Sequence, residues 1–141
     1  MSFSSFVLPV RIYYEDTDAG GVVYHANYLR FMERARTELL RSMGYGRQKM
    51  VTDRGLVLVA SKVTLAYHRP AFLDDELQVL TELKSSGVVR MVFHQKILRD
   101  GICLCEGTVV LGCVDIQAMK PARMPAELMT ICQRLKESTR E

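Results

Sequence analysis

One stretch near the amino terminus gathers the side chains that could do chemistry. From Val10 to Arg36 the sequence reads VRIYYEDTDAGGVVYHANYLRFMERAR, with three carboxylates, two adjacent glycines and a histidine between an expected strand and an expected helix. Asp16 and Asp18 stand two positions apart, and a carboxylate in such a loop can act as a general base or as a nucleophile. The pattern alone equally allows Asp16, Thr17 and Asp18 to be turn and cap residues. Spacing does not decide between these roles.

The glycines and the histidine of this stretch are candidates for a site that binds an oxyanion. Gly20 and Gly21 let the backbone turn tightly and let a ligand approach it closely. His25 and Asn27 stand at the start of the expected helix, where free backbone N–H groups point outward and the helix dipole favours negative charge. A carboxylate beside such a helix end would suit attack on a carbonyl group, because the N–H groups stabilise the oxyanion that forms.

Two elements must hold this stretch in place, a strand before it and a helix after it. Val7 to Tyr14 alternates into an aromatic pair and predicts a strand. Between Asn27 and Met43 the apolar side chains recur every three or four positions, which predicts an amphipathic helix of about five turns. Gly44 follows the last apolar position, where a left-handed cap is expected.

The polar face of that helix carries charges at pairing distance. Arg34 and Glu38 stand four positions apart, a spacing at which opposite charges meet on a helix surface. Glu33 and Glu38 are therefore interpreted as members of ion pairs rather than as catalytic acids.

The rest of the chain predicts an antiparallel meander closed by a helix. Asp100-Gly101 is a strong signal for a tight hairpin. The predicted fold class is α+β, a five-stranded antiparallel sheet wrapped around one long helix, with a short C-terminal helix, in a single domain spanning residues 1–141. The remaining expected elements are strands at Leu56 to His68, Glu76 to Lys84, Val88 to Arg99 and Ile102 to Asp115, and a helix from Pro125 to about Lys136.

Composition excludes several classes of protein. The chain has 141 residues, 48% of them hydrophobic and 25% charged, with a formal net charge of +3. These values exclude a disordered chain, a collagen-like fibre and a two-lobed enzyme. The charge is mild and no basic tract is interleaved with aromatics, so no nucleic-acid partner is expected. Apolar stretches fall far short of the roughly 20 residues of a membrane span, and residues 1–9 carry no secretion signal, so a cytoplasmic protein is expected.

The cysteines and two histidines are interpreted as structural. The spacing of the four cysteines matches no zinc motif, so no metal site is predicted and reduced thiols are expected. His68 and His94 have no thiol or carboxylate partner by spacing, which favours structural or surface roles. The cysteines are Cys103, Cys105, Cys113 and Cys132.

Three segments carry a family resemblance. The chain closely resembles the YbgC-type acyl-CoA thioesterases, in the 4-hydroxybenzoyl-CoA thioesterase branch of the hotdog superfamily, over the stretch YYEDTDAGGVVYHANYLRFMERAR. It also resembles them over LAYHRPAFLDDELQV and CVDIQAMKPARMP, so the resemblance covers nearly the whole chain. The resemblance implies a hotdog fold and hydrolysis of acyl-CoA to free acid and coenzyme A. It implies no metal and no cofactor apart from the coenzyme A of the substrate.

The resemblance also implies roles for single residues. Asp18, the second aspartate of D-T-D-A-G-G, matches the catalytic carboxylate, which either activates water or attacks the thioester carbonyl. His25 matches the position at the helix N-terminus whose backbone N–H polarises that carbonyl, and Tyr14 matches an aromatic hydroxyl bordering the site. The plainer alternatives are a helix residue without chemical role for His25 and strand packing for Tyr14.

Four further residues are candidates for binding the substrate. Gly21, Tyr24 and Asn27 lie within the matching stretch, around the carboxylate and the helix start. Lys62 interrupts an apolar strand and could reach a phosphate of coenzyme A, although a strand lysine in solvent is an equally good interpretation.

A chain this short has little material with which to close a core and also enclose a substrate, and its sheet edges need cover. We therefore expect a homodimer or a dimer of dimers, that is, a homotetramer. The resemblance implies short-chain or related acyl groups, acyl carrier protein as an alternative carrier, and a link to envelope or phospholipid metabolism through the Tol-Pal gene neighbourhood. The rival functions are a non-catalytic acyl-CoA or acyl-carrier binding protein and an enoyl-thioester hydratase on the same fold.

Overall fold

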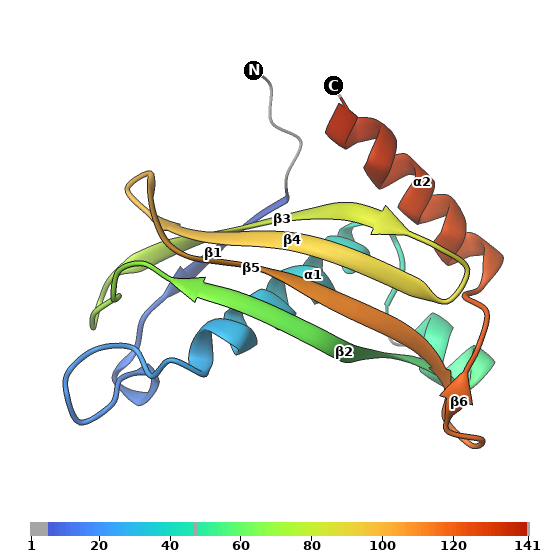
Figure 1. Cartoon of the computed structure of the whole chain (residues 1–141), viewed down its shortest axis with the longest axis horizontal. Helices are drawn as coiled ribbons and strands as arrows, with labels where there is room; N and C mark the ends of the chain where they lie inside the picture. The colour runs from blue at the N-terminus through green and yellow to red at the C-terminus, as the bar shows by residue number, and fades with distance from the viewer. Residues whose placement is uncertain (1–5, 47, 141) are drawn as a thin grey trace.

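Five long strands form one curled antiparallel sheet in the order β1-β3-β4-β5-β2 (Figure 1). A two-residue strand, β6, pairs with the end of β5, so a short sixth strand is added to the five that the sequence predicts. The strands are β1 (Phe6–Arg11), β2 (Leu56–Tyr67), β3 (Glu76–Ser86), β4 (Arg90–Arg99), β5 (Ile102–Asp115) and β6 (Lys120–Pro121).

The structure is a computed structural model that describes residues 6–46 and 48–140. Residues 1–5, part of the segment in which no secretion signal is expected, lie outside the described residues.

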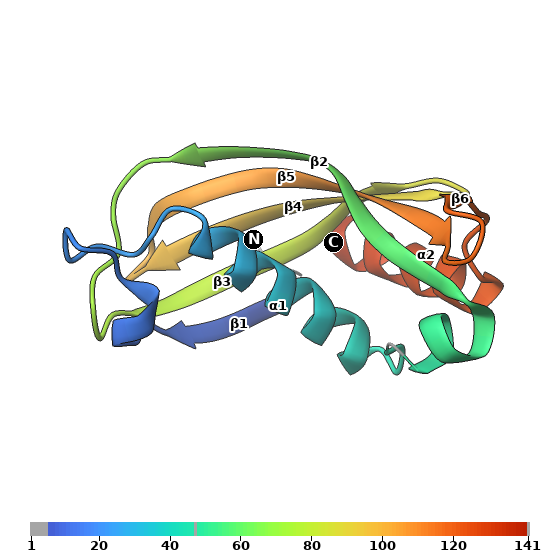
Figure 2. The ribbon, with the colours of Figure 1, turned by 90° about the horizontal axis from the view of Figure 1, so that it is seen from below.

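The long helix α1 (Asn27–Ser42) lies along the concave face of the sheet, which confirms the α+β architecture of a sheet wrapped around one helix (Figure 2). Its apolar stripe is buried because every third or fourth side chain faces the strands. Gly44 adopts a φ of +81°, as a left-handed cap requires. The buried stripe consists of Tyr28, Phe31, Met32, Ala35 and Leu39.

The second helix, α2 (Ala126–Arg140), is longer than the sequence predicts and packs against β3. The Pro125 carbonyl accepts hydrogen bonds from the amides of Leu128 and Met129, so the chain turns into the helix directly after the proline. A π-helical turn, η2 (Gln48–Thr52), precedes β2. No helix among the described residues is long and apolar enough to cross a membrane.

The first strand ends earlier than the sequence predicts. β1 stops at Arg11, and Tyr14–Asp16 form a 3-10 turn, η1, instead of continuing the strand. The Asp16 carboxylate accepts a hydrogen bond from the Tyr13 amide at 2.9 Å and closes this turn. The prediction of a strand through Tyr14 is therefore wrong, because a local side-chain bond competes with the ladder.

The ion pairing of α1 also differs from the prediction. The Glu38 carboxylate pairs with Arg41 rather than with Arg34. Arg34 instead lies over the ring of Phe31, with 5.7 Å between the guanidinium carbon and the ring centroid.

One buried polar cluster joins α1 to the sheet. The Gln95 side chain on β4 is fully buried, and its amide donates to the Met32 carbonyl of α1 at 3.0 Å and to the Thr81 hydroxyl at 2.7 Å. Its carbonyl oxygen accepts a hydrogen bond from Arg36 at 2.9 Å. The cluster is satisfied on all these atoms, as a buried polar group must be.

The strand β2 forms one edge of the sheet. Among the described residues it pairs with β5 only, with a register shift between Ala60 and Lys62. Val59 and Val63 are each 40% exposed, so apolar side chains are accessible to solvent on this edge strand. Such an edge invites pairing with another strand.

Candidate active site

The loop between η1 and α1 is a tight turn that presents Asp18. Thr17 and Val23 form an isolated antiparallel bridge, and the Asp18 amide donates to the Val22 carbonyl at 2.8 Å. The Gly21 amide donates a hydrogen bond to the Asp18 carbonyl at 3.0 Å, and Gly21 adopts a φ of +84°. That conformation is open to glycine without strain, which explains a glycine at this point of the turn.

The Asp18 carboxylate is exposed and held by one backbone bond. Its Oδ1 accepts a hydrogen bond from the Gly20 amide at 2.8 Å. A Cβ at Gly20 would lie 3.2 Å from that same oxygen, so the glycine permits the close approach. Oδ2 has no hydrogen-bond partner among the described residues, which leaves it available to a water molecule or to a carbonyl carbon.

The start of α1 is fastened to the same loop through Asp16. The Asp16 carbonyl accepts hydrogen bonds from the Tyr24 amide at 3.0 Å and from the Asn27 side-chain amide at 2.9 Å. Ala26 is the N-cap and has no side chain that could accept a bond from the helix. The N-terminus of α1 therefore lacks a side-chain cap, and Asp18 is tied to it through a short run of backbone.

His25 lies beside two tyrosine rings at this helix end. Its ring centroid is 4.7 Å from that of Tyr24 and 6.3 Å from that of Tyr67. The Tyr67 hydroxyl donates to the His25 carbonyl at 2.9 Å, and burial raises the pKa of Tyr67 above its ordinary value. Tyr67, at the end of β2, thus fixes the position of His25, two residues before α1 begins.

Nothing in the sequence indicates this contact, because Tyr67 is one of many apolar residues of a predicted strand. The contact depends on the fold, which brings the end of β2 next to the start of α1.

The other predicted site residues differ in how close they come to Asp18. Tyr14 is 82% exposed, and its carbonyl accepts the Thr17 hydroxyl at 2.7 Å, so it borders the loop and takes no part in strand packing. Asn27 is 7% exposed, and its side-chain amide donates a hydrogen bond to the loop. Lys62 is exposed on β2, five residues before Tyr67, or about 17 Å along the strand.

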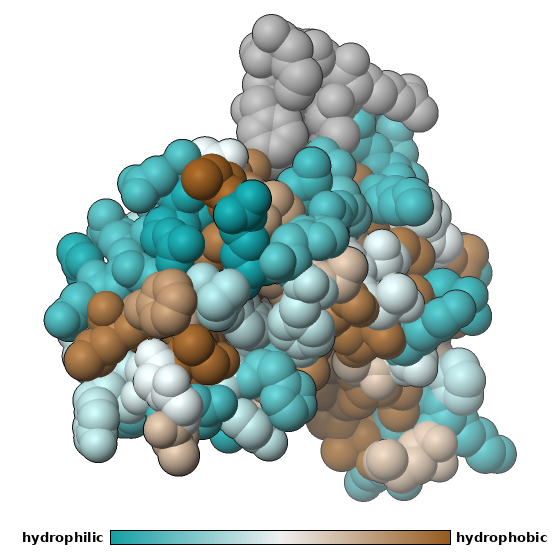
Figure 3. All heavy atoms as spheres, turned by 60° about the vertical axis from the view of Figure 1, so that its left-hand side comes forward, coloured by the Kyte–Doolittle hydropathy of each residue, from teal (hydrophilic) through white to brown (hydrophobic). Residues whose placement is uncertain are grey.

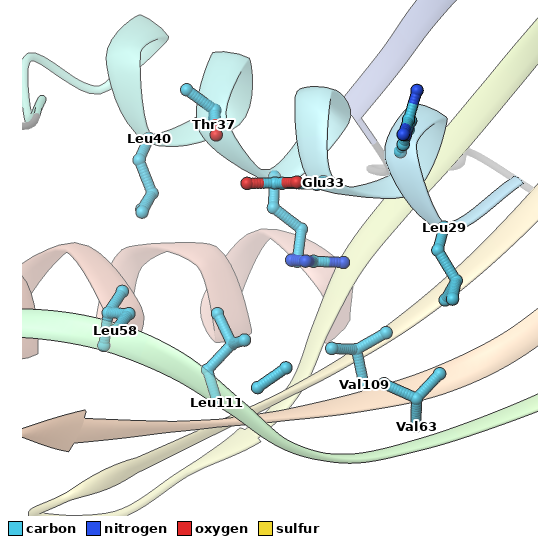
Figure 4. A pocket seen from close by; sticks show the side chains of 11 residues that line it. Leu29, Glu33, Thr37, Leu40, Leu58, Val63, Val109 and Leu111 are labelled. Atoms are coloured by element: carbon cyan, nitrogen blue, oxygen red, sulfur yellow. The ribbon is translucent and has the colours of Figure 1, made fainter. Parts of the chain in front are cut away.

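A groove leads away from this end along the helix. It has a volume of about 380 Å³ and lies between α1 on one side and β2 and β5 on the other (Figure 4). From Leu29 to Leu40 its helical wall runs for about 16 Å. The walls are mainly apolar, with Arg30, Glu33 and Arg36 as charged members.

The molecular surface at the loop end is mixed in character. Apolar side chains lie among polar ones over the end that carries the loop and the turn after β2 (Figure 3). Tyr24 is 47% exposed and Phe72 is 45% exposed here. Among the described residues, one cluster of histidine, cysteine and acidic side chains could share a metal ion, and it includes neither Asp18 nor His25.

A curled sheet around one long helix, with an exposed carboxylate in the loop before that helix, defines a class of protein. The family model of the thioesterase-like superfamily matches residues 13–131. The crystal structure of a probable thioesterase from Bartonella henselae superposes with a TM-score of 0.80 at 32% identity, covering 86% of this chain and 99% of that one.

Two curated relatives narrow the class to a family. The acyl-CoA thioesterase YbgC of Haemophilus influenzae is 43% identical over 133 residues, 94% of this chain and 98% of that protein. The acyl-CoA thioester hydrolase YbgC of Escherichia coli is 45% identical over 130 residues, 92% of this chain and 96% of that protein. The chain belongs to the YbgC-type acyl-CoA thioesterases of the hotdog superfamily.

Proposed function

We propose that the protein hydrolyses acyl-CoA thioesters to free acid and coenzyme A. The observation that carries this proposal is the exposed Asp18 carboxylate, fastened by the Asp16 carbonyl to the uncapped N-terminus of α1. The named activities of the H. influenzae and E. coli relatives support the same reaction.

The helix end supplies the electrophilic half of the reaction. A thioester carbonyl oxygen placed at the start of α1 meets backbone N–H groups and the positive end of the helix dipole. His25 lies at this point, with its carbonyl held by Tyr67, so its backbone is fixed before substrate binds. The developing negative charge is then stabilised without movement of the protein.

Asp18 supplies the attacking half by one of two routes. In the first, the carboxylate takes a proton from water, and the hydroxide adds to the carbonyl carbon. In the second, the carboxylate itself adds, and water opens the resulting anhydride. In both routes the C–S bond breaks and a thiolate leaves, which is easier than loss of an alkoxide because thiols are more acidic. One carboxylate and one helix end suffice, so the proposed reaction uses no metal and no cofactor.

The groove along α1 is our proposed site for the acyl group. It begins within one turn of His25 and has apolar walls from Leu29, Leu58 and Val63. Its volume of about 380 Å³ suits a short-chain or related acyl group. On the coenzyme side, Gly21 and Tyr24 border the loop, and Lys62, exposed on β2, is the proposed contact for a phosphate of coenzyme A.

A second copy of the chain completes the proposed site. β2 has a free edge with exposed valines, and the groove opens beside it. Pairing of two β2 strands would continue the sheet and cover the groove. We propose a homodimer on this edge, from which a dimer of dimers can be built.

The cellular setting in this proposal rests on the resemblance alone. It consists of a cytoplasmic enzyme of envelope or phospholipid metabolism, linked to the Tol-Pal genes, with acyl carrier protein as a second possible thioester carrier. Parallel turnover of one acyl group on coenzyme A and on acyl carrier protein separates the two carriers.

The central test is the Asp18→Asn variant, which keeps shape and removes the charge. We expect kcat to fall by about 10² or more, a loss of roughly 3 kcal/mol of transition-state stabilisation. The measurement is release of free thiol from a panel of acyl-CoAs. Asp53→Asn is the matched control, because Asp53 is bonded to Gln48 on η2 and should leave kcat unchanged. Near-full hydrolysis by Asp18→Asn would refute the assignment.

The same panel separates the rival functions. Binding of acyl-CoA without thiol release from any substrate would favour a non-catalytic carrier-binding protein. Loss of enoyl absorbance without thiol release would favour an enoyl-thioester hydratase.

A further inference from the structure

The outer face of the sheet carries a row of polar side chains that thioester hydrolysis does not use. Gln95 faces α1, so its neighbour His94 on β4 points to the opposite face. Glu82 on β3 stands in register with His94, with 3.6 Å between the Oε1 of Glu82 and the Nδ1 of His94. The other ring nitrogen, Nε2, is 3.7 Å from the Oε2 of Glu106 on β5. The Nε2 of His68, just after β2, is 3.2 Å from the Oε1 of Glu106.

A cysteine adds a soft ligand to the end of this row. The Sγ of Cys103 on β5 is 3.9 Å from the Oε1 of Glu106. The ligand atoms of His68, Cys103 and Glu106 all lie within 4.8 Å of one another. Sequence spacing does not show this group, because the antiparallel pairing of β2 with β5 brings its members together.

Two of the three ligand separations are close to those of a tetrahedral transition-metal site. Metal bonds of about 2.0 Å to nitrogen and oxygen and about 2.3 Å to sulfur place tetrahedral ligands about 3.3 Å apart for N and O and about 3.5 Å for S and O. The corresponding distances are 3.2 Å between His68 and Glu106 and 3.9 Å between Cys103 and Glu106. The ligand atoms of His68 and Cys103 lie within 4.8 Å of each other, so these two side chains must move together by about 1 Å, which side-chain rotation allows, to reach coordination distance.

The charges around the group also suit a divalent cation. A bound thiolate and a carboxylate carry two negative charges, which balance the two positive charges of the ion. Lys96, the cross-strand partner of Glu106, is an opposing cation and is exposed on β4. His94 contacts the second oxygen of Glu106, and Glu82 contacts the second nitrogen of His94, the arrangement by which outer residues orient a metal ligand.

We propose that His68, Cys103 and Glu106 form a binding site for Zn²⁺ or a similar late transition ion, with the fourth position open to water. Sulfur and imidazole ligands favour such an ion over Mg²⁺ and Ca²⁺, which prefer oxygen. The ion would join the end of β2 to the start of β5. His68 directly follows Tyr67, so the site would fix the strand end whose tyrosine holds the His25 carbonyl.

The test is a titration of the full chain with CoCl₂ under reducing, oxygen-free conditions. We expect one Co²⁺ per chain, with the near-ultraviolet absorption of a thiolate-to-cobalt bond, displaced by ZnCl₂ and not by MgCl₂. Cys103→Ser should abolish this absorption, and His68→Gln and Glu106→Gln should raise the Kd at least about tenfold. Cys132→Ala and His25→Gln remove a thiol and an imidazole elsewhere and should leave it unchanged. Absence of saturable binding, or absorption that persists in Cys103→Ser, would overturn the proposal.

A second measurement needs no variant and so does not depend on correct folding of a mutant. Cys103 is partly exposed, whereas Cys105, Cys113 and Cys132 are buried. Zn²⁺ should slow alkylation of Cys103 in the native chain at least about tenfold, located by peptide mass, because the bound thiolate is no longer free to react. Equal alkylation with and without Zn²⁺ would count against the site.

Discussion

At the residue scale, Gly20 and Gly21 are adjacent but serve different ends. Gly20 leaves room for the Asp18 carboxylate, since an added Cβ would lie 3.2 Å from its Oδ1. Gly21 has open space around it but adopts a φ of +84°, which disfavours any other residue. Gly20 therefore allows the position of the Asp18 carboxylate, and Gly21 allows the backbone conformation of the turn.

These two glycines give a paired prediction. Gly20→Ala should lower kcat about tenfold with little change in stability, because the carboxylate is displaced by a few tenths of an ångström. Gly21→Ala should lower the free energy of unfolding by about 1 kcal/mol, because the left-handed conformation strains an alanine. Thiol-release kinetics and urea denaturation of both variants provide the two readouts. The reverse pattern, with stability lost only at Gly20, would contradict this division of roles.

At the element scale, the edge strand β2 determines whether the site is complete. Its residues make backbone pairs only on the β5 side, and Val59 is 40% exposed without lining the groove. A dimer on this edge would bury that valine against the partner strand. The proposed enzyme would then lose activity whenever its subunits separate.

The variant Val59→Asp tests the edge. A charge placed on an interface strand should shift the protein toward the monomer, and thiol release should fall in step with the dimer fraction. Sedimentation equilibrium and activity measured over the same range of protein concentration give both quantities. Val88→Asp is the control, because Val88 is 43% exposed in the β3–β4 turn, which β5 separates from β2. A fully dimeric and active Val59→Asp protein would exclude the β2 edge as the interface.

The elements themselves show which parts of the fold local sequence can determine. The α1 helix follows from its apolar period, and the Asp100-Gly101 hairpin follows from two residues that accept positive φ, observed at 52° and 81°. The end of β1 also has a local cause, the hydrogen bond from the Tyr13 amide to the Asp16 carboxylate, but the alternating pattern through Tyr14 does not reveal it. The His68 and Cys103 group is set instead by strand register, which no short window of sequence contains.

The candidate active site also has parts that local sequence predicts and parts that only the fold determines. The Asp18 loop and the helix start are continuous in sequence, so one motif predicts both. Tyr67 comes from a distant strand and is brought to His25 only by the fold. Asn27 was predicted to contact substrate, yet its side-chain amide bonds to the Asp16 carbonyl, a partner that spacing could not identify.

At the scale of the whole molecule, the buried thiols link stability to pH. Burial, followed by the charges of Cys103 and Glu106, raises the pKa of Cys105 from 9.0 to about 12. Below pH 9 the thiol is protonated in both the folded and the unfolded chain, so its contribution to stability is fully present. Between pH 9 and about 12 the unfolded chain loses the proton and the folded chain keeps it, so stability falls as pH rises.

The expected slope is up to about 1.4 kcal/mol per pH unit from this one group. Urea unfolding from about pH 8 to about pH 11 measures it. Cys105→Ala removes the titrating group and should flatten the alkaline fall relative to the wild-type chain. An equally steep fall in that variant would assign the effect to other groups.

The buried cluster around Gln95 has a consequence for how this scaffold can change. Its bonds to the Met32 carbonyl, to Arg36 and to Thr81 fix the rotational setting of α1 against the sheet. A slide of the helix by one turn would leave a buried amide and a guanidinium unpaired at the same time, which is costly. Side chains along the groove can therefore be exchanged to fit different acyl groups while the helix end stays in place. Substrate range and catalytic geometry become separately variable properties of the same helix.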